Sequence, residues 1–369
     1  MAHVEKRGAN RWRARFRDPD GRERSRTFSR RIDAERWLAT VSTDILRGAY
    51  IDPSAGQVTF GRYALEWQTI QVHRPSTELL VDRHLRNHLL PFFEHRPIAA
   101  VRPTDIQGWV KDRSTVLGPR TVELAYRYLA AIFRAAVEDR LIASSPCRGI
   151  KLPRAATEEI VPLQTEQVLA LAAAVPDRYR AMVLFAAGTG VRQGEAFGLS
   201  VPRLDMLRRT VRIDQQIVWL PRTGAQLGPP KTKASNRTIP LPEVTIDALA
   251  AHLAAFPAAG EWDLVFTNPR GEPISRSTFG DIWRGAVRRA GAPEGTGFHD
   301  LRHYYASLLI RHGESVKVVQ ARLGHASATE TLDTYSHLWP DAEDRTRLAV
   351  DSVLGTTPVE AADGDGVGG

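Results

Sequence analysis

Four short motifs in the second half of the chain carry side chains suited to binding an anion, and the first contains Arg192 and Glu195. Gly188 and Gly190 predict that one helix ends here and another begins, with Arg192 in the first turn of the new helix. A cation at that end opposes the helix dipole, whereas a forked guanidinium directed at an anion would explain the residue. Glu195 could hold Arg192 in place, although a plain surface ion pair is the alternative interpretation.

The second motif runs from His299 to His303, at the start of a predicted helix that ends near Gly313. His299 and Arg302 are three residues apart and therefore share one face of that helix. His299 and His303 are four residues apart, which is the spacing of a zinc-binding helix. No third ligand is obvious, and a phosphate-binding arginine in the same turn fits a metal site poorly. We therefore expect no metal here, and satisfied surface histidines are the other alternative.

The third motif joins two predicted helices at Gly324 and His325. Gly324 is a natural residue just beyond a helix end, so His325 is expected in a tight turn. Ser327 and Glu330 have the spacing of a capping box for the next helix, which ends near Tyr335. Taken alone, Tyr335 would be interpreted as a buried anchor of that helix.

The fourth motif is a lysine-rich turn between Pro230 and Arg237, just before a predicted strand. It offers Lys231 and Lys233 as cations, and a solvated basic hairpin is the alternative interpretation.

Together these motifs resemble the catalytic signature of the tyrosine recombinase, or phage integrase, family. Their order and spacing match the family pattern over about residues 160–345. The matching residues are Arg192 with Gly194 and Glu195, Lys231 with Thr232, His299 with Arg302, Gly324 with His325, and Tyr335. The resemblance implies a site-specific recombinase that cleaves and rejoins DNA through a 3′-phosphotyrosyl intermediate and so integrates or excises a phage or mobile element.

The resemblance also implies a role for each residue. Tyr335 would be the nucleophile, and it needs cationic neighbours because a tyrosine hydroxyl has a pKa of about 10. Arg192 and Arg302 would neutralise the non-bridging oxygens in the transition state. The remaining expected roles are proton donation to the departing 5′ oxygen by Lys231, hydrogen bonding or proton transfer by His299 and His325, and support by Glu195 and Gly324.

Two arginines and a lysine would take the place of metal ions, so we expect no metal, no ATP and no other cofactor. The expected partners are double-stranded DNA attachment sites, three further copies of the chain in a synaptic tetramer, and accessory proteins that bend DNA or set direction. A type IB topoisomerase and a non-catalytic DNA-binding protein remain as alternative functions. The basic N-terminus and a separate helical domain favour the recombinase.

The composition agrees with a DNA-binding protein. The 369 residues carry a net charge of +8 with a pI near 9.9, which indicates a polyanionic partner. A single cysteine, Cys147, excludes a disulfide framework and fits a reducing cytoplasm, so we expect a bacterial cytoplasmic protein at the nucleoid. Apolar runs such as Ala181–Ala187 are far shorter than the ~20 residues of a membrane helix.

The positive charge is concentrated at the N-terminus, where residues 1–50 hold thirteen Lys or Arg and seven Asp or Glu. Alternating residues predict strands at 11–17 and 22–28, joined by a turn at Asp18–Gly21, and a helix at 32–46 follows. This unit, residues 1–52, resembles the arm-site-binding domain of integrases. The arginines expected to contact DNA are Arg11, Arg13, Arg15, Arg17, Arg24 and Arg26.

The fold class expected is multidomain. After a linker at 53–56, residues 57–150 are predicted to form an all-α domain that resembles a core-DNA-binding domain by position and pattern. A second linker at 151–156 leads to a catalytic domain at 158–355. That domain is expected to be mainly α, with a small antiparallel sheet built from strands near 210–213, 216–219 and 237–241. The tail, 356–369, is predicted to be disordered. Apolar residues after Tyr335 are expected to pack on a neighbouring protomer or on their own domain: Leu338, Trp339, Leu348, Val350, Val353 and Leu354.

Overall fold

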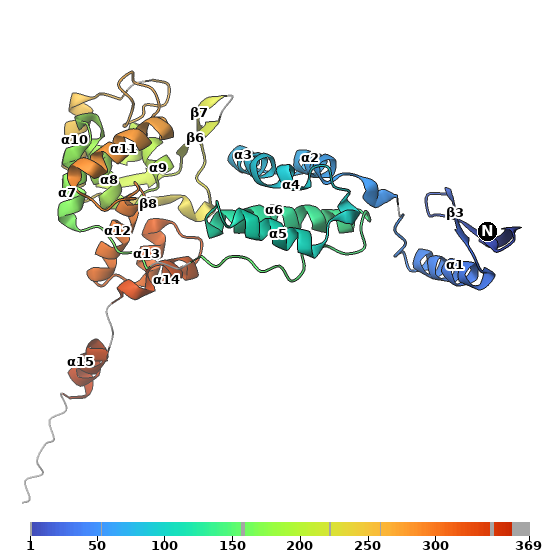
Figure 1. Ribbon diagram of the computed structural model, residues 1–369. Helices are drawn as coiled ribbons and strands as arrows, with labels where there is room; N and C mark the ends of the chain where they lie inside the picture. Colours follow the sequence, from blue (N-terminus) through green and yellow to red (C-terminus); the bar gives the residue numbers. More distant parts are fainter. Residues whose placement is uncertain are drawn as a thin grey trace, which may run out of the picture. The chain divides into compact units, whose positions relative to one another are not determined.

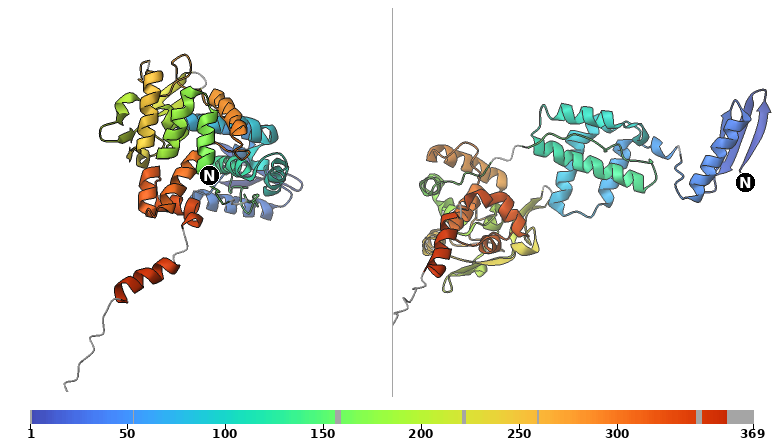
Figure 2. Two further views of the ribbon diagram at one scale, coloured as in Figure 1. Left: turned by 90° about the vertical axis from the view of Figure 1, so that its left-hand side faces the viewer. Right: turned by 90° about the horizontal axis from the view of Figure 1, so that it is seen from below.

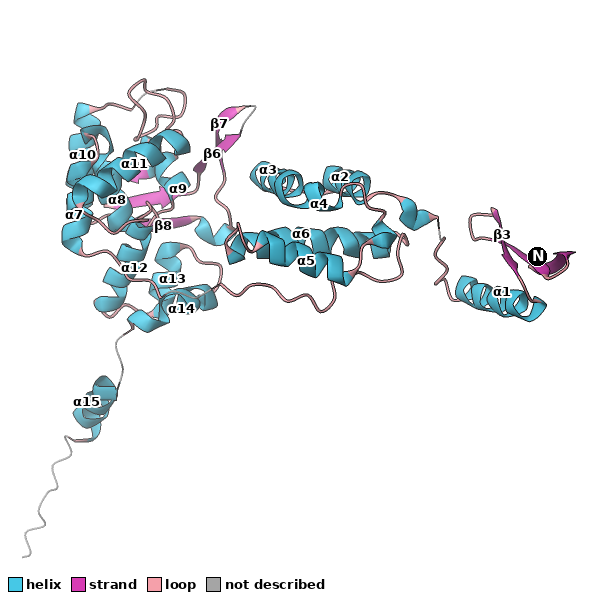
Figure 3. Ribbon diagram, in the orientation of Figure 1, coloured by secondary structure: helices cyan, strands magenta, loops and turns pink. Residues whose placement is uncertain are grey.

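The computed structural model describes residues 2–52, 54–155, 159–220, 223–258, 260–339 and 343–355. The chain divides into two compact units, Met1–Thr157 and Glu158–Gly369, called here the N-terminal and C-terminal units (Figures 1 and 3). The tail predicted to be disordered, 356–369, lies outside the described residues. Within the described part of the chain, no helix is both long and apolar enough to cross a membrane.

The N-terminal unit begins with a three-stranded antiparallel sheet covered on one face by a helix (Figure 2, right). The strands are β1 (His3–Gly8), β2 (Arg11–Arg17) and β3 (Glu23–Phe28), in the order β1-β2-β3, and the helix is α1 (Arg31–Leu46). Ala14 and Phe16 of β2 are buried, and Phe16 meets Trp37 of α1 edge to face at 5.5 Å. Strand β1 was not predicted, because its residues carry only one aliphatic side chain and pairing with β2 defines it.

The second half of the N-terminal unit is all helical. Its principal helices are α2 (Phe60–Ile70), α3 (Pro75–His84), α4 (Leu90–Phe93), α5 (Pro103–Arg113) and α6 (Pro119–Glu138). Thr59 caps α2, as its hydroxyl accepts the Arg62 backbone N–H at 3.4 Å. One apolar stripe of α6, which includes Val122, Leu129 and Ile132, is fully buried. The structure describes every residue from 54 to 155 and has no strand there, as predicted.

The C-terminal unit is mainly helical. Its helices are α7 (Thr165–Ala174), α8 (Asp177–Thr189), α9 (Gln193–Phe197), α10 (Glu243–Ala255), α11 (Arg276–Ala290), α12 (Asp300–Arg311), α13 (Val316–Leu323), α14 (Ala328–Tyr335) and α15 (Glu343–Leu354). Two small antiparallel sheets occur, where the sequence predicted one. The first contains β4 (Leu204–Asp205), β5 (Thr210–Ile213) and β8 (Arg237–Pro240), in that order.

The second sheet is a hairpin of β6 (Gln216–Leu220) and β7 (Gly224–Gly228). Strand β7 was missed because its sequence, Gly-Ala-Gln-Leu-Gly, has no strand-forming pattern. The predicted strand at 216–219 therefore pairs with this segment and not with its neighbours β5 and β8.

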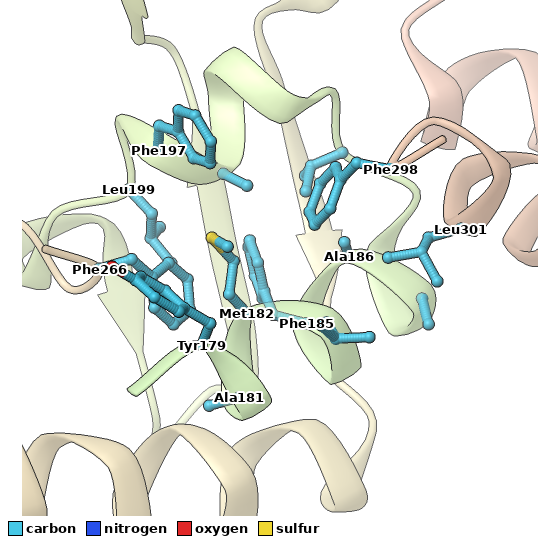
Figure 4. Packing of buried hydrophobic residues seen from close by; sticks show 14 of the residues in the cluster. Tyr179, Ala181, Met182, Phe185, Ala186, Phe197, Leu199, Phe266, Phe298 and Leu301 are labelled. Carbon is cyan, nitrogen blue, oxygen red and sulfur yellow. The ribbon is translucent and has the colours of Figure 1, made fainter. Parts of the chain in front are cut away.

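Helix α8 is the centre of the C-terminal unit, in contact with α7, α10 and α12. Met182 and Phe185 of α8 are fully buried, and Figure 4 shows them among aromatic and aliphatic side chains from other segments. Phe298 and Leu301 belong to the same cluster. Because Phe298 directly precedes His299 and Leu301 directly precedes Arg302 in the chain, core packing fixes the start of α12.

The residues after Tyr335 divide into two groups. Leu338 and Trp339 are partly buried and pack against a cluster that includes Tyr305, Leu323 and Tyr335. The side chains of α15 that were expected to pack are exposed, by 49–72%: Leu348, Val350, Val353 and Leu354.

Candidate active site

A cleft of roughly 400 Å³ in the C-terminal unit brings together five of the six expected catalytic side chains. Its wall contains Arg192, Lys231, His299, Arg302 and His325. They come from segments up to 133 residues apart in the chain (325 minus 192). The other residues of the wall are Thr232, Gly324, Ala326 and Glu330.

Arg192 is held from several sides at the N-terminus of α9. Gly190 ends α8 in the left-handed conformation, with φ +64°, and Arg192 is the N-cap of the next helix. Its Nη1 donates to Glu195 Oε1 at 3.0 Å and to Ser235 Oγ at 3.1 Å, and its Nη2 lies 3.5 Å from the Gly324 carbonyl oxygen. The side chain is 26% exposed, so these bonds aim the guanidinium while leaving part of it open.

Glu195 is buried between two arginines. Its side chain is 1% exposed and accepts hydrogen bonds from the Arg192 backbone N–H and from Arg237 Nη2, each at 2.9 Å. Burial opposes ionisation of this carboxyl, but the charge and hydrogen bond of Arg237, with those of Arg192, lower its pKa below the ordinary value. Arg237 was not singled out from the sequence. It also donates to the carbonyl oxygens of Ser235 and Arg322, and so ties the lysine-bearing loop to the end of α13.

Arg302 has one donor with no partner. The residue is 2% exposed, and its Nη1 donates to the Gly190 carbonyl oxygen at 2.8 Å. Its Nη2 is buried and makes no hydrogen bond within the described residues. Burial, followed by the charges of Arg192 and Arg237, lowers the pKa of Arg302 to about 9, which still leaves it charged at neutral pH. A buried charged donor without an acceptor is costly unless an anion binds to it.

The two expected histidines line the same cleft as Arg302. His325 is buried, and its Nδ1 is 2.9 Å from Thr331 Oγ1 while its Nε2 is 3.7 Å from Glu330 Oε1. Burial and the nearby charge of Arg302 lower the pKa of His325 to about 4. His299 is exposed at the wall of the cleft, where partial desolvation and the charges of His303 and Arg302 also lower its pKa.

The lysine-rich loop and the turn after α13 pack closely. Lys231 and Lys233 are both exposed, but only Lys231 belongs to the cleft wall. Gly324 has φ +67°, and a Cβ there would lie 2.9 Å from the Ala234 carbonyl oxygen and 3.0 Å from Ser235 Cα. Glycine is therefore required on two counts, backbone conformation and close approach.

Tyr335 ends α14 next to the cleft wall. It is 1% exposed, and its ring lies parallel to that of His325, with centroids 6.4 Å apart. Its hydroxyl oxygen is 2.8 Å from His303 Nδ1. Burial raises the pKa of Tyr335 to about 12, although Arg302 and Arg192 act in the opposite direction. His303 therefore faces Tyr335 in the structure. From the sequence it was interpreted only as half of a zinc-binding spacing or as a surface histidine.

Among the residues described, no group of three or more His, Cys, Asp or Glu could hold a metal ion.

The six arginines expected to bind DNA at the N-terminus do not share one face. Arg11, Arg13, Arg15 and Arg17 alternate with Trp12, Ala14 and Phe16 and so lie on the sheet face away from α1.

Arg24 and Arg26 pair with Phe16 and Ala14, which places them on the α1 side of the sheet. Arg24 forms ion pairs with Asp18 and Asp52, and Arg26 lies over the rings of Phe28 and Trp37. This placement could have been predicted from the sequence. Arg24, Arg26 and Phe28 are two residues apart along the strand, so the arginines share the face of the apolar Phe28.

Comparison with known proteins shows which family the chain resembles. Residues 162–341 match the phage integrase family, and residues 3–47 match the N-terminal domain of phage integrases. A protein of Mycobacterium tuberculosis named as the prophage phiRv2 integrase is 30% identical over 341 residues, which cover 89% of each chain.

Solved structures share the fold. The integrase of the transposon Tn1549, bound to transposon right-end DNA, superposes with a TM-score of 0.70 and 22% identity, covering 80% of this chain and all of that one. A lambda integrase tetramer bound to a Holliday junction gives a TM-score of 0.58 and 19% identity, over 92% of this chain and 98% of that one.

Proposed function

Because the chain belongs to the phage integrase family and is a tyrosine-type site-specific DNA recombinase, we propose that Tyr335 is the nucleophile of its strand cleavage. The Tyr335 oxygen attacks a DNA phosphorus and displaces the 5′ oxygen, leaving a 3′-phosphotyrosyl bond. A 5′ hydroxyl from a partner strand reverses the reaction. The covalent bond conserves the energy of the phosphodiester, so rejoining needs no ATP.

The other residues of the cleft would stabilise the transition state and move protons. Arg192 and Arg302 bind the non-bridging oxygens, where negative charge accumulates, and His299 and His325 add hydrogen bonds. Lys231 donates a proton to the departing 5′ oxygen. Glu195 and Gly324 support the site, the first by holding Arg192 and the second by its close contact with the lysine loop.

The unpaired Nη2 of Arg302 is the observation that carries this proposal. It is a buried cationic donor in the wall of a cleft that also holds Arg192 and Lys231, and a DNA phosphate would supply the missing acceptor. Two changes must accompany binding. The Tyr335 hydroxyl must be uncovered, since the residue is 1% exposed, and the phosphate must compete with the Glu330 carboxylate beside His325.

The rest of the chain would bind DNA outside the cleavage site and so direct the enzyme to its attachment sites. Residues 57–150 are proposed to bind the core site, and residues 1–52 the arm sites, through the face that carries Arg11, Arg13, Arg15 and Arg17. Four protomers would assemble on two sites, and a lambda integrase forms a tetramer on a Holliday junction. Accessory proteins would take part, and the reaction would occur at the bacterial nucleoid. The exposed apolar residues of α15 are available for packing between protomers.

A two-site assay tests the function. The substrate is a supercoiled plasmid that carries both attachment sites, taken from DNA flanking the gene, with excess chelator present. We expect exchange of flanking DNA to persist in chelator, since Arg192, Arg302 and Lys231 neutralise the transition state. Relaxation of the plasmid without exchange would indicate a topoisomerase instead, and loss of exchange that zinc restores would indicate a metal site.

A further inference from the structure

His303 lies against the atom that must react, yet it belongs to none of the roles assigned above. Its Nδ1 is 2.8 Å from the Tyr335 hydroxyl oxygen, and the two rings meet at 63° with centroids 5.6 Å apart. This is the one hydrogen bond of the Tyr335 hydroxyl within the described residues.

The direction of this hydrogen bond follows from protonation. Burial and the charge of Arg302 lower the pKa of His303 to about 4, so its imidazole is neutral at neutral pH. Burial raises the pKa of Tyr335 to about 12, so the phenol keeps its proton. That proton has no other acceptor among the described residues, and a buried hydroxyl without one is unfavourable. Tyr335 therefore donates, and His303 Nδ1 accepts.

The other two imidazoles are placed differently. His325 Nδ1 is engaged with Thr331 Oγ1, and its Nε2 points to Glu330. His299 is exposed in the cleft wall, and no hydrogen bond joins it to Tyr335. Within the described chain, His303 is the imidazole that contacts the phenolic oxygen.

We infer that His303 is a catalytic residue that takes the proton of Tyr335 during strand cleavage. As the Tyr335 oxygen forms its bond to phosphorus, its proton passes to His303 Nδ1, and as the bond from phosphorus to the 5′ oxygen breaks, Lys231 gives a proton to that oxygen. Atoms and charges balance, since one proton is taken up and one is released. A neutral imidazole is a sufficient base because the phenol becomes strongly acidic as its oxygen bonds to phosphorus.

This inference rests on Tyr335 as the nucleophile, and its test separates the two claims. The measurement is the single-turnover rate of cleavage of a nicked core site, with DNA affinity measured in parallel by fluorescence anisotropy. The variants are His303→Ala, His303→Gln and, as a control, His312→Ala, which removes an exposed imidazole at the end of the same helix. We expect both His303 variants to cleave about 10²–10⁴-fold more slowly with unchanged affinity, and the control to match the parent chain.

Two further measurements test whether His303 acts as the proton acceptor. Added imidazole should restore part of the rate of His303→Ala but none to Tyr335→Phe. Sulfur at the bridging 5′ position should leave His303→Ala slow, because it changes the leaving group and not the nucleophile. A normal rate in His303→Gln, which keeps an acceptor but cannot take up a proton, would overturn the inference, as would failure of imidazole to rescue. An adduct formed by Tyr335→Phe would instead overturn the proposed nucleophile.

Discussion

At the scale of single residues, the assignment of Lys231 as the proton donor makes a specific prediction. An alkoxide is a poor leaving group, and proton donation contributes about 10²–10⁴-fold to such reactions. When sulfur replaces the bridging 5′ oxygen of the substrate, the leaving group is a thiolate, which needs no proton. We therefore expect Lys231→Ala to cleave ordinary DNA very slowly and the sulfur substrate at nearly the parent rate.

Two variants serve as controls for that measurement. Arg192→Ala should not be rescued, because its partner is a non-bridging oxygen that the sulfur leaves unchanged. Lys233 is also exposed in the same loop but does not belong to the cleft wall. Rescue of Lys233→Ala in place of Lys231→Ala would show that the wrong lysine was assigned.

The buried carboxylate of Glu195 is predicted to stabilise the C-terminal unit. Removing one partner of a buried ion pair costs about 3–5 kcal/mol, and Glu195→Gln would leave Arg237, 5% exposed, without its counter-charge. Asp281→Asn, which breaks an exposed pair with Arg284, should change stability little and is the control. Urea unfolding near neutral pH measures the difference, and equal midpoints for the parent chain and Glu195→Gln would contradict it.

The pH dependence of that difference has a defined sign. The pKa of Glu195 is lowered in the folded protein, so its stabilisation is present above the ordinary pKa of 4.5 and is lost as the pH falls through the folded value. The gap between the parent chain and Glu195→Gln should therefore narrow in acid. A gap that widens would mean that the carboxyl is protonated in the native state.

The catalytic residues could be predicted from the sequence, but some of their contacts could not. The resemblance to the family's motifs was sufficient to select Arg192, Lys231, His299, Arg302 and His325, and the structure gathers all of them at one cleft. Spacing could not show that Arg237 would reach Glu195 from 42 residues away, or that His303 would face Tyr335 from 32 residues away. The first contact joins β8 to α9 and the second joins α14 to α12, so both depend on how these elements pack together.

At the scale of elements, the turn between α13 and α14 is predicted to position the lysine loop. Gly324→Ala places a Cβ 2.9 Å from the Ala234 carbonyl oxygen, in addition to straining the backbone. Gly291→Ala is a matched control, because it has φ +63° with no atom within 4 Å of the added Cβ. We expect similar backbone costs of about 1 kcal/mol for both, but slower cleavage only for Gly324→Ala. Equal cleavage rates in the two variants would mean that the contact with the loop has no role.

Elements with strong local signals were predicted well. The cap at Ser327 and the left-handed glycine at Gly324 are both present. Strands β1 and β7 were missed because neither has an apolar alternation of its own, and each is a strand only through pairing with a stronger neighbour.

At the scale of the whole molecule, the positive charge concentrated in residues 1–52 predicts that this segment is a separate DNA-binding domain. Deleting them should spare cleavage of a core site but impair integration and remove binding to arm sites. The point variants Arg11→Ala and Arg17→Ala change only exposed side chains, and together they should reduce the salt slope of arm-site binding by about two. If the shortened chain recombines as well as the full chain, this segment is not an arm-binding domain.

The most direct test of the central claim is to identify the residue that becomes joined to DNA. A nicked core site traps the covalent product, and mass spectrometry of the digested adduct locates the nucleotide on the chain. The account predicts a 3′-phosphate ester on Tyr335, and no adduct from Tyr335→Phe despite normal DNA affinity, because that variant loses only the nucleophilic oxygen. An adduct at another residue, or one that persists in Tyr335→Phe, would contradict it.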